Sequence, residues 1–312
     1  MMILVYIENE NGQPIKASLE ALNAAEQVAA KGSSSVVAVV TDATMADVVA
    51  AYGADEVITV AVNAYQPEDY AATLANIFEK SGAQLLLMGS TREGKELAAR
   101  VAAQIKSGCI TDATELTDAG WLRSIYGGAL REAVDCSDKC VVTIRPGTFG
   151  KPEMDPSKKA VVKTESMTES AIKTVIRDVV HELSEDVNLE DAEIIVAGGR
   201  GMGSAENFAL VHELAELLGG VVGASRPAIE EGWISRNRQV GQSGKIVAPK
   251  LYIACGISGA MQHTSGMSGS GYIVAINKDE DAPIFEIADV GIVGNVTEIL
   301  PLMIEEIKAR KS

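Results

Sequence analysis

The sequence predicts an α/β protein of two domains, each built on a mostly parallel sheet. Short apolar runs rich in Val, Ile, Leu and Ala alternate with longer segments that repeat apolar residues at helical spacing. Only 4% of the residues are aromatic although 47% are hydrophobic, which is typical of an aliphatic α/β interior. With 312 residues the chain is long enough for two domains that each bury a core.

The first half of the chain is predicted to form βαβ repeats. Its expected strands are short and aliphatic: Met2–Glu8, Val36–Thr41, Glu56–Val62 and Gln84–Gly89. Apolar residues at helical spacing predict the helices that follow them: Ser18–Lys31, Met45–Tyr52, Glu68–Ser81 and Glu93–Ile105. Such repetition implies a parallel sheet with right-handed crossovers.

Beyond Cys109 the pattern changes to strands separated by hairpin-type breaks, which adds antiparallel members to the sheet. The expected strands are Thr111–Leu116, Trp121–Tyr126, Gly128–Ala133, Cys140–Arg145 and Ala160–Lys163. A helix is expected over Ala171–Leu183, where Ile172, Val175, Ile176 and Val179 recur at helical spacing. The first domain is therefore predicted to hold a mixed, mostly parallel sheet.

A polar break from Glu185 to Asp191 divides the chain, and we place the domain boundary near Val187. The first domain then covers residues 1–187 and the second covers 188–312, which we expect to be a doubly wound parallel sheet. Its expected strands are Glu193–Ala197, Val221–Ala224, Leu251–Cys255 and Tyr272–Ile276. Ala282–Glu286 is expected to be extended, and the expected helices are Ala205–Leu218 and Val296–Arg310.

Composition narrows the possible partners and the compartment. The net charge of −16 argues against nucleic acid, which requires a basic face. No apolar run is long enough to insert in a membrane, and the start of the chain lacks the basic residues of a signal peptide. We expect a cytoplasmic protein. Its cysteines are expected to be ordinary reduced thiols, because no second Cys or His pair lies near Cys136 and Cys140 to complete a metal site.

The second domain carries the chemistry, because polar or glycine-rich loops follow four of its expected strands. These loops are Gly198–Gly203, Ser225–Pro227, Gly256–His263 and Asn277–Asp279. In an open parallel sheet ligands bind outside the carboxyl ends of the strands, so the loops are expected to converge on one dinucleotide. Gly256 and Gly259 permit a tight turn before a helix start, which favours a phosphate at that position.

Other ligands and reactions fit the motifs less well. The spacing of Gly199, Gly201 and Gly203 does not match the G-x-G-x-x-G fingerprint of a nicotinamide-dependent enzyme. Hydrolase chemistry by Ser258 and His263 would need an orienting acid that the sequence does not place. A flavin suits the residues better. Its reduced forms carry negative charge near N1 and the C2 carbonyl, where Arg226 or His263 would stabilise it, and a Ser243 hydroxyl would suit N5.

The long motif from Val240 to His263 resembles the alpha subunit of electron-transfer flavoproteins. So do Ile273–Asp279 with the following Ala282–Phe285, the loops Gly198–Gly201 and Gly223–Arg226, and the first-domain segment Gly89–Gly94. The resemblance covers essentially the whole chain. It implies a nucleotide-hydrolase-like first domain that packs against a beta subunit, and a second domain that binds FAD.

The resemblance also implies roles near the redox-active ring of FAD. Ser225 and Arg226 would lie beside the isoalloxazine, with Arg226 supplying positive charge. His263 would face the C2 carbonyl side of the ring. The residues that would line the ring are Val240, Gly241, Gln242 and Ser243, and Ser243 replaces the threonine that is common in the family.

Further residues are implied on the phosphate and adenosine side. Arg200 would contact the phosphate or adenosine part, and Asn277 the adenosine portion. Asn295 and Val296, where many members have Asp-Leu, would make an adenine-side contact. The pyrophosphate would be held by Ser258, Gly259, Ala260, Met261 and Gln262.

The function that the resemblance implies is electron transfer in a heterodimer. The chain would carry electrons to or from acyl-CoA dehydrogenases or related flavoproteins, without turning over a substrate of its own. An alternative within the family is electron bifurcation, with NADH and a second FAD in the beta subunit. The run from Arg226 to Gln239 looks closer to members from anaerobic metabolism. A cofactor-free scaffold that only binds partners is a further alternative.

Overall fold

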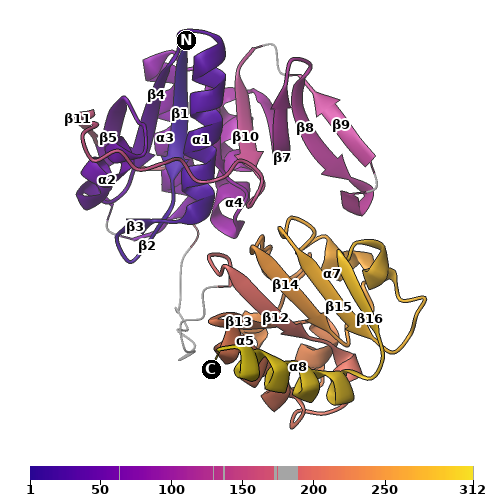
Figure 1. Cartoon of the computed structure of the whole chain (residues 1–312). Helices are drawn as coiled ribbons and strands as arrows, with labels where there is room; N and C mark the ends of the chain where they lie inside the picture. Colours follow the sequence, from indigo (N-terminus) through magenta and orange to yellow (C-terminus); the bar gives the residue numbers. More distant parts are fainter. Residues whose placement is uncertain (63, 129, 136–137, 172–173, 175–188, 312) are drawn as a thin grey trace. The chain divides into compact units, whose positions relative to one another are not determined.

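The computed structural model describes residues 1–62, 64–128, 130–135, 138–171, 174 and 189–311. The chain divides into two compact units, Met1–Val180 and His181–Ser312 (Figure 1). Almost all of the predicted helix Ala171–Leu183, and the predicted boundary near Val187, lie outside the described residues.

Unit 1 contains a nine-stranded sheet in the order β11-β5-β4-β1-β6-β10-β7-β8-β9. Six of its strands pair in parallel: β1 (Met2–Ile7), β4 (Ser35–Val40), β5 (Glu56–Val60), β6 (Leu85–Gly89), β10 (Cys140–Ile144) and β11 (Val161–Glu165). β7 (Gly108–Thr117) pairs in parallel with β10 and continues into an antiparallel meander with β8 (Gly120–Ile125) and β9 (Leu130–Val134). The predicted mixed, mostly parallel sheet is confirmed.

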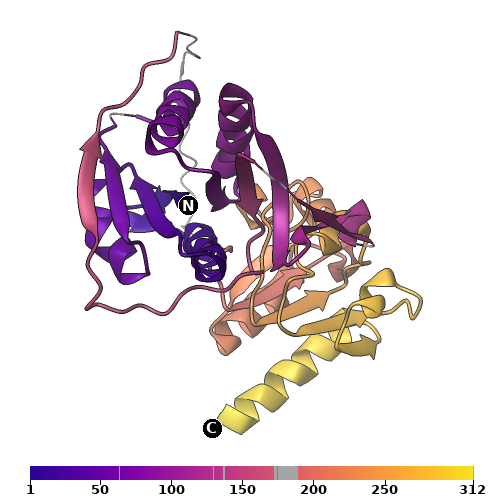
Figure 2. The ribbon, with the colours of Figure 1, turned by 90° about the horizontal axis from the view of Figure 1, so that it is seen from above.

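Helices cover both faces of this sheet (Figure 2). α1 (Lys16–Lys31) and α2 (Ala46–Ala51) pack on one face, and α3 (Pro67–Ser81) and α4 (Arg92–Ile105) pack on the other. The ends of the helices are set by local hydrogen bonds and backbone conformation. The Thr91 hydroxyl accepts a hydrogen bond from the Gly94 N–H at the start of α4, and Gly82 ends α3 in the left-handed conformation.

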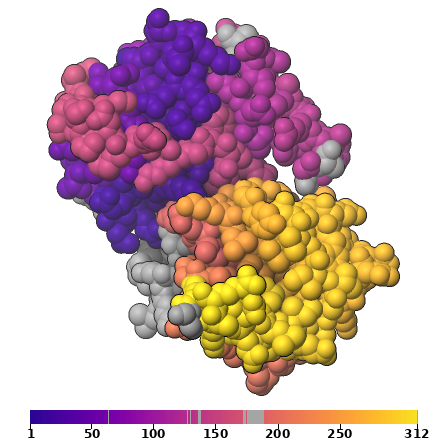
Figure 3. Space-filling model, in the orientation of Figure 1, coloured from indigo at the N-terminus to yellow at the C-terminus, as the bar shows by residue number. Residues whose placement is uncertain are grey.

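Two connections of unit 1 add detail that the strand and helix pattern did not predict. A small hairpin joins β2 (Asn9–Glu10) to β3 (Gln13–Pro14) through Asn11-Gly12, both at positive φ, and Asn-Gly is the expected signal for such a turn. The connection from β10 to β11 crosses the outside of the unit (Figure 3). It is held there by hydrogen bonds from Asn23 to the Phe149 carbonyl and from the Asp155 N–H to the Ala51 carbonyl.

Unit 2 contains a five-stranded sheet in which every pair is parallel, in the order β13-β12-β14-β15-β16. The strands are β12 (Ile194–Gly198), β13 (Val221–Ala224), β14 (Leu251–Cys255), β15 (Ile273–Asn277) and β16 (Val290–Val293). β16 was not predicted, because it is a short edge strand with mostly exposed side chains and a glycine in it. The predicted extended segment Ala282–Glu286 is wrong. Pro283–Glu286 is a 3-10 turn, which begins at a proline and is closed by a hydrogen bond from the Phe285 N–H to the Ala282 carbonyl.

The two faces of this sheet are covered differently. α5 (Phe208–Leu218) and α8 (Val296–Lys311) bury one face, with Val211, Leu214 and Leu300 against the strands. α5 begins later than the predicted Ala205, because residues before Phe208 form turns in which Asn207 donates to the Met202 carbonyl. The other face is buried under the segment 239–249, the short α7 (Met261–Thr264) and the 3-10 turn.

The direction in which successive strands are added to the sheet of unit 2 reverses between β12 and β14. β13 follows β12 to one side, whereas β14 and later strands lie on the other, so the loops after β12 and β14 separate at this point. They still touch at their glycines. The Gly199 N–H donates to the Cys255 carbonyl at 2.8 Å and the Gly201 N–H donates to the Gly256 carbonyl at 2.9 Å. Such a switch point creates a crevice at the carboxyl edge of the sheet.

The described residues contain no helix long and apolar enough to cross a membrane. They also contain no group of three or more side chains placed to hold a metal ion. Cys109, Cys140 and Cys255 form no disulfide, and Cys136 lies outside the described residues.

The glycine contact generates a stability prediction. At Gly256, φ is +63° and an added Cβ would stand 2.8 Å from the Gly201 backbone. We expect Gly256→Ala to lower the free energy of unfolding by about 2 kcal/mol or more, because a left-handed alanine alone costs roughly 1–2 kcal/mol. Gly269→Ala is the control, since its Cβ would meet Ala248 at an ordinary 3.5 Å. Equal denaturation midpoints for the two variants would contradict this account.

Candidate cofactor site

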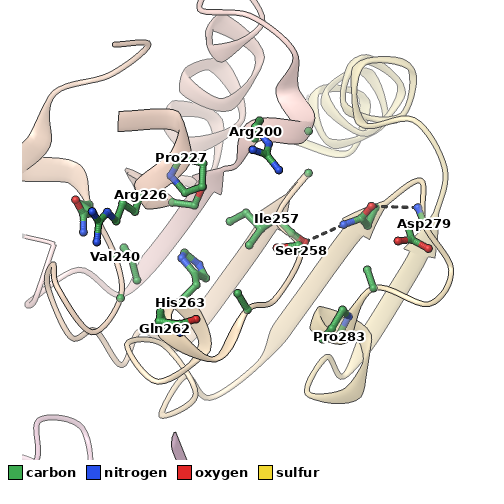
Figure 4. A pocket seen from close by; sticks show the side chains of 18 of the residues that line it. Arg200, Arg226, Pro227, Val240, Ile257, Ser258, Gln262, His263, Asp279 and Pro283 are labelled. Atoms are coloured by element: carbon green, nitrogen blue, oxygen red, sulfur yellow. Dashed lines mark hydrogen bonds between the residues drawn. The ribbon is translucent and has the colours of Figure 1, made fainter. Parts of the chain in front are cut away.

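A cavity of about 740 Å³ lies at the carboxyl edge of the unit 2 sheet (Figure 4). The loops after β12, β13, β14 and β15 all reach it, as the sequence predicted, and the segment 239–243 closes one side. Arg226 and Val240 lie at one end of the view, and Asp279 and Pro283 lie at the other. The volume is within the usual range of roughly 300–1,000 Å³ for cofactor and small-molecule sites.

Most of the predicted binding residues line this cavity: Arg200, Ser225, Arg226, Val240, Gly241, Gln242, Ser243, Ser258, Ala260, Gln262, His263 and Asn277. Four predicted residues are not in its lining: Gly259, Met261, Asn295 and Val296. Met261 is exposed, and Val296 is the buried first residue of α8. Asn295 accepts from the Thr297 N–H at 3.2 Å and so caps the start of α8.

The structure adds lining residues that the sequence did not single out as ligands: Gly201, Pro227, Gln239, Gly256, Ile257, Lys278, Asp279, Ala282 and Pro283. Most of them belong to motifs already recognised. Gln239 is the informative addition, because it is buried and donates from Nε2 to the Ser243 hydroxyl at 3.0 Å. Its only signal in the sequence was its position directly before Val240 and Gly241, because its burial is seen only in the structure.

The cavity is basic in an acidic protein. Its lining holds the cations of Arg200, Arg226 and Lys278 against the single carboxylate of Asp279, while the whole chain carries −16. The backbone N–H groups from Ser258 to Gln262 make no hydrogen bond within the described part of the chain. Cations and unpaired N–H groups in one cavity favour an anionic ligand such as a pyrophosphate.

Arg226 stands at the cavity rim on α6 (Arg226–Glu230). Its Nε donates to Glu230 Oε1 at 2.7 Å, one turn along the helix, and both side chains are exposed. An exposed pair at this spacing contributes only about 0.3–0.5 kcal/mol. The guanidinium can therefore leave Glu230 for a ligand at little cost.

The segment from Val240 to Ser243 is held by the turn that carries His263. The Gln242 N–H donates to the Gln262 carbonyl at 2.7 Å. At Gly241 φ is +136°, and an added Cβ would lie 2.6 Å from the same carbonyl, so a glycine is required there. Gln239 fixes the position of the Ser243 hydroxyl from behind. Two sequence motifs that were predicted to share one ligand are thus joined directly.

His263 projects into the cavity from α7 and is only 7% exposed (Figure 4). Its Nε2 lies 3.0 Å from the Tyr252 hydroxyl, and Nδ1 has no hydrogen-bond partner among the described residues. Burial lowers the pKa of His263 to about 4, with a smaller opposing effect of the Val240 carbonyl. The imidazole is therefore neutral at pH 7, and His263 supplies no positive charge to the cavity. Nε2 is engaged by Tyr252 and not by Ser258.

Asn277 lines the cavity but also holds its loops together. Its Nδ2 donates to the Ile257 carbonyl at 2.9 Å, and its Oδ1 accepts from the Asp279 N–H at 3.1 Å (Figure 4). The side chain therefore ties the end of β15 to the turn after β14. Its predicted contact with an adenosine stays a prediction.

Two family models match the chain. The model described as "Electron transfer flavoprotein domain" matches residues 3–170, and the one described as "Electron transfer flavoprotein FAD-binding domain" matches residues 188–268. The second match spans the loops after β12, β13 and β14, with Ser243 and His263. Fold, cavity and matches together define an electron-transfer protein that binds a flavin.

Curated relatives agree over nearly the full length. "Electron transfer flavoprotein subunit alpha" of Thermoanaerobacterium thermosaccharolyticum is 41% identical, across 99% of this chain and 98% of its own. The protein of the same name from Mycobacterium tuberculosis is 40% identical, across 99% of each chain. "Protein FixB" of Clostridium saccharobutylicum is 39% identical, across 98% of this chain and 96% of its own. The chain belongs to the electron transfer flavoprotein alpha subunit family, and its cofactor is FAD.

The neutral His263 generates a pH prediction. Because the folded pKa is about 4 and an unfolded histidine titrates near 6.5, the unfolded state binds the extra proton first as pH falls. Between pH 7 and pH 5 this group should remove about 2 kcal/mol of stability. We expect cofactor-free wild type to lose that much more than His263→Gln in denaturant titrations. Equal losses for both proteins would show that His263 is not buried in its neutral form.

Proposed function

We propose that this chain is the alpha subunit of a heterodimeric electron-transfer flavoprotein that carries electrons between other flavoproteins, including acyl-CoA dehydrogenases. Its partner in the heterodimer is the beta subunit that the family implies. The observation that carries the proposal is the cavity of unit 2. It gathers cations, a buried imidazole and backbone N–H groups that have no partner in the described part of the chain. FAD supplies the electron-transfer chemistry when it is bound there.

The cavity supports one orientation of FAD. The end with Arg226, Ser243 and His263 offers a cation, a hydroxyl and an imidazole, which suit the redox-active ring. The turn from Ser258 to Gln262 offers N–H groups to the pyrophosphate. The end with Arg200 and Asn277 is then left for the adenosine portion, and the predicted contacts of Asn295 and Val296 would extend it.

A carrier is preferred over an enzyme that converts a substrate. Among the described lining residues, the only imidazole is His263, whose Nε2 is taken by Tyr252. The one lining carboxylate, Asp279, comes from the loop at the opposite end of the view from Val240. The pairing of nucleophile, base and orienting acid that group transfer needs is not assembled in this cavity.

We also infer a cytoplasmic location and the domain division at residues 187 and 188 from the sequence.

Electron bifurcation is the second candidate, favoured by the run from Arg226 to Gln239, which resembles family members from anaerobic metabolism. In that case the beta subunit would hold another FAD and oxidise NADH. The alpha chain would keep the same cavity for its own FAD.

Cofactor counting separates the two candidates. We expect the purified heterodimer to contain FAD in the alpha chain, and acid extraction with chromatography measures how many nucleotides accompany it. Two FAD per heterodimer would support bifurcation. One FAD with one AMP would establish a simple carrier, whereas a flavin-free heterodimer that still engages its partners would favour a scaffold and contradict the proposal.

Arg226 generates a redox prediction. Removing its positive charge in Arg226→Gln should weaken the binding of reduced FAD roughly tenfold relative to oxidised FAD, which lowers a two-electron midpoint potential by about 30 mV. Spectroelectrochemical titration measures the shift. Arg310→Gln is a matched control, because Arg310 also pairs at 2.7 Å with a glutamate one turn away, on α8 and outside the cavity. An identical shift in both variants would place Arg226 away from the ring.

A further inference from the structure

The hydroxyl of Tyr252 is buried beneath the candidate cofactor cavity. Tyr252 lies on β14 with 0% exposure, in the apolar cluster that includes Val240, Val247 and Met267. Its hydroxyl lies 3.0 Å from His263 Nε2, the only hydrogen bond that it makes within the described part of the chain. The rings are 6.2 Å apart at 60°, so the contact is through the hydroxyl and not through stacking.

The hydrogen-bond partners available to the two side chains decide which of them is the donor. If Nε2–H donated to the phenol oxygen, the tyrosine O–H would be buried without an acceptor. An unsatisfied buried donor costs about 1–3 kcal/mol. If the phenol donates to the Nε2 lone pair, the tyrosine O–H and Nε2 are both satisfied, and the only atom of the pair without a partner among the described residues is His263 Nδ1. Burial raises the pKa of Tyr252 well above its ordinary value, so the phenol keeps its proton at all working pH values.

The other nitrogen of the ring then carries the imidazole proton. In a neutral histidine one nitrogen accepts and the other donates, so an Nε2 that accepts leaves the hydrogen on Nδ1. Nδ1 itself is buried and has no partner of normal hydrogen-bond geometry among the described residues.

We propose that Tyr252 is a positioning residue that holds His263 as the neutral Nδ1–H tautomer, so that the imidazole presents an uncharged N–H donor to the bound cofactor. This inference rests on the proposed placement of the flavin ring beside His263. It changes the chemistry expected there: the site offers a fixed dipole and not a cation. A fixed donor stabilises negative charge on the reduced ring without requiring proton uptake by the protein.

The backbone around His263 also restricts the ring. The His263 N–H donates to the Ala260 carbonyl at 2.8 Å, and the neighbouring Gln262 carbonyl accepts from the Gln242 N–H. The turn is thus fixed from both sides, and the remaining freedom is the rotation of the imidazole. Tyr252 opposes this rotation, because turning the ring would break the hydrogen bond between its hydroxyl and Nε2.

The tautomer is measured directly by nitrogen NMR of the purified complex labelled with ¹⁵N-histidine, with and without FAD. The chain has three histidines, and loss of one signal set in His263→Gln assigns the ring. We expect a protonated-type shift for Nδ1 and an unprotonated-type shift for Nε2, unchanged from pH 8 to pH 5. A proton on Nε2, or an imidazolium at pH 7, overturns the inference without any mutation of Tyr252.

The redox consequence is measured with Tyr252→Phe, which removes only the hydroxyl and keeps the packed ring. We expect mixed His263 tautomers and a midpoint potential lower by about 30 mV, the equivalent of a tenfold change for two electrons. Tyr272→Phe, at a 46% exposed tyrosine of the same unit, should change neither. In a His263→Gln background, Tyr252→Phe should have no further effect, and an undiminished shift there would overturn the inference.

These readouts also separate this inference from the proposed function. If the NMR shows the expected tautomer but His263→Gln leaves the potential unchanged, the tautomer control by Tyr252 is supported and the placement of the flavin ring beside His263 is wrong. If the potential responds to His263→Gln but the wild-type proton lies on Nε2, the placement is supported and the positioning role of Tyr252 is wrong.

Discussion

The backbone contact between two glycine loops is the constraint on which the site of unit 2 depends. Gly199 and Gly201 follow β12, and Gly256 follows β14, at the point where the order of the strands reverses. Their N–H and carbonyl groups pair at distances that leave no room for a Cβ atom. Because the loops are locked together at their bases, they separate above the sheet in a defined way, and the cavity forms between them.

The cavity has the opposite charge to the chain as a whole. The chain as a whole is strongly acidic, yet the cavity gathers three cations and one carboxylate, together with backbone N–H groups. Local anion affinity is therefore compatible with a surface that repels free nucleic acid and other polyanions. The exposed pair of Arg226 and Glu230 fits this arrangement. Because the ion pair is weak, the guanidinium can exchange Glu230 for an anionic ligand at little cost in free energy.

The pairing of Tyr252 with His263 connects the core of the sheet to the redox end of the cavity. A histidine on a surface turn would be protonated in part at neutral pH and would rotate. Here burial holds the ring neutral, and a phenol beneath it selects the tautomer. The same apolar cluster that stabilises unit 2 thus sets which atom of the imidazole faces a ligand. Stability and electron-transfer chemistry share these residues.

The sequence by itself determined the order of the elements, the two sheets and most of the cavity lining. Periodicity is a local property, so β13 and β14 were predicted with their observed bounds, and long motifs identified Arg226, Ser243 and His263 as neighbours of one ligand. Local patterns were weakest where context decides the structure. They missed the edge strand β16 and mistook the turn at Pro283 for an extended segment.

Only the tertiary structure decided what the site residues can do chemically. The charge of His263 depends on the burial of its side chain, and its tautomer depends on a tyrosine eleven residues earlier in the chain. Gln239 gained a role because its segment folds back on Ser243, and Asn277 proved to bind loops of its own domain. Desolvation and hydrogen-bond partners are set by atoms that the fold brings together, and no residue spacing along the chain records them.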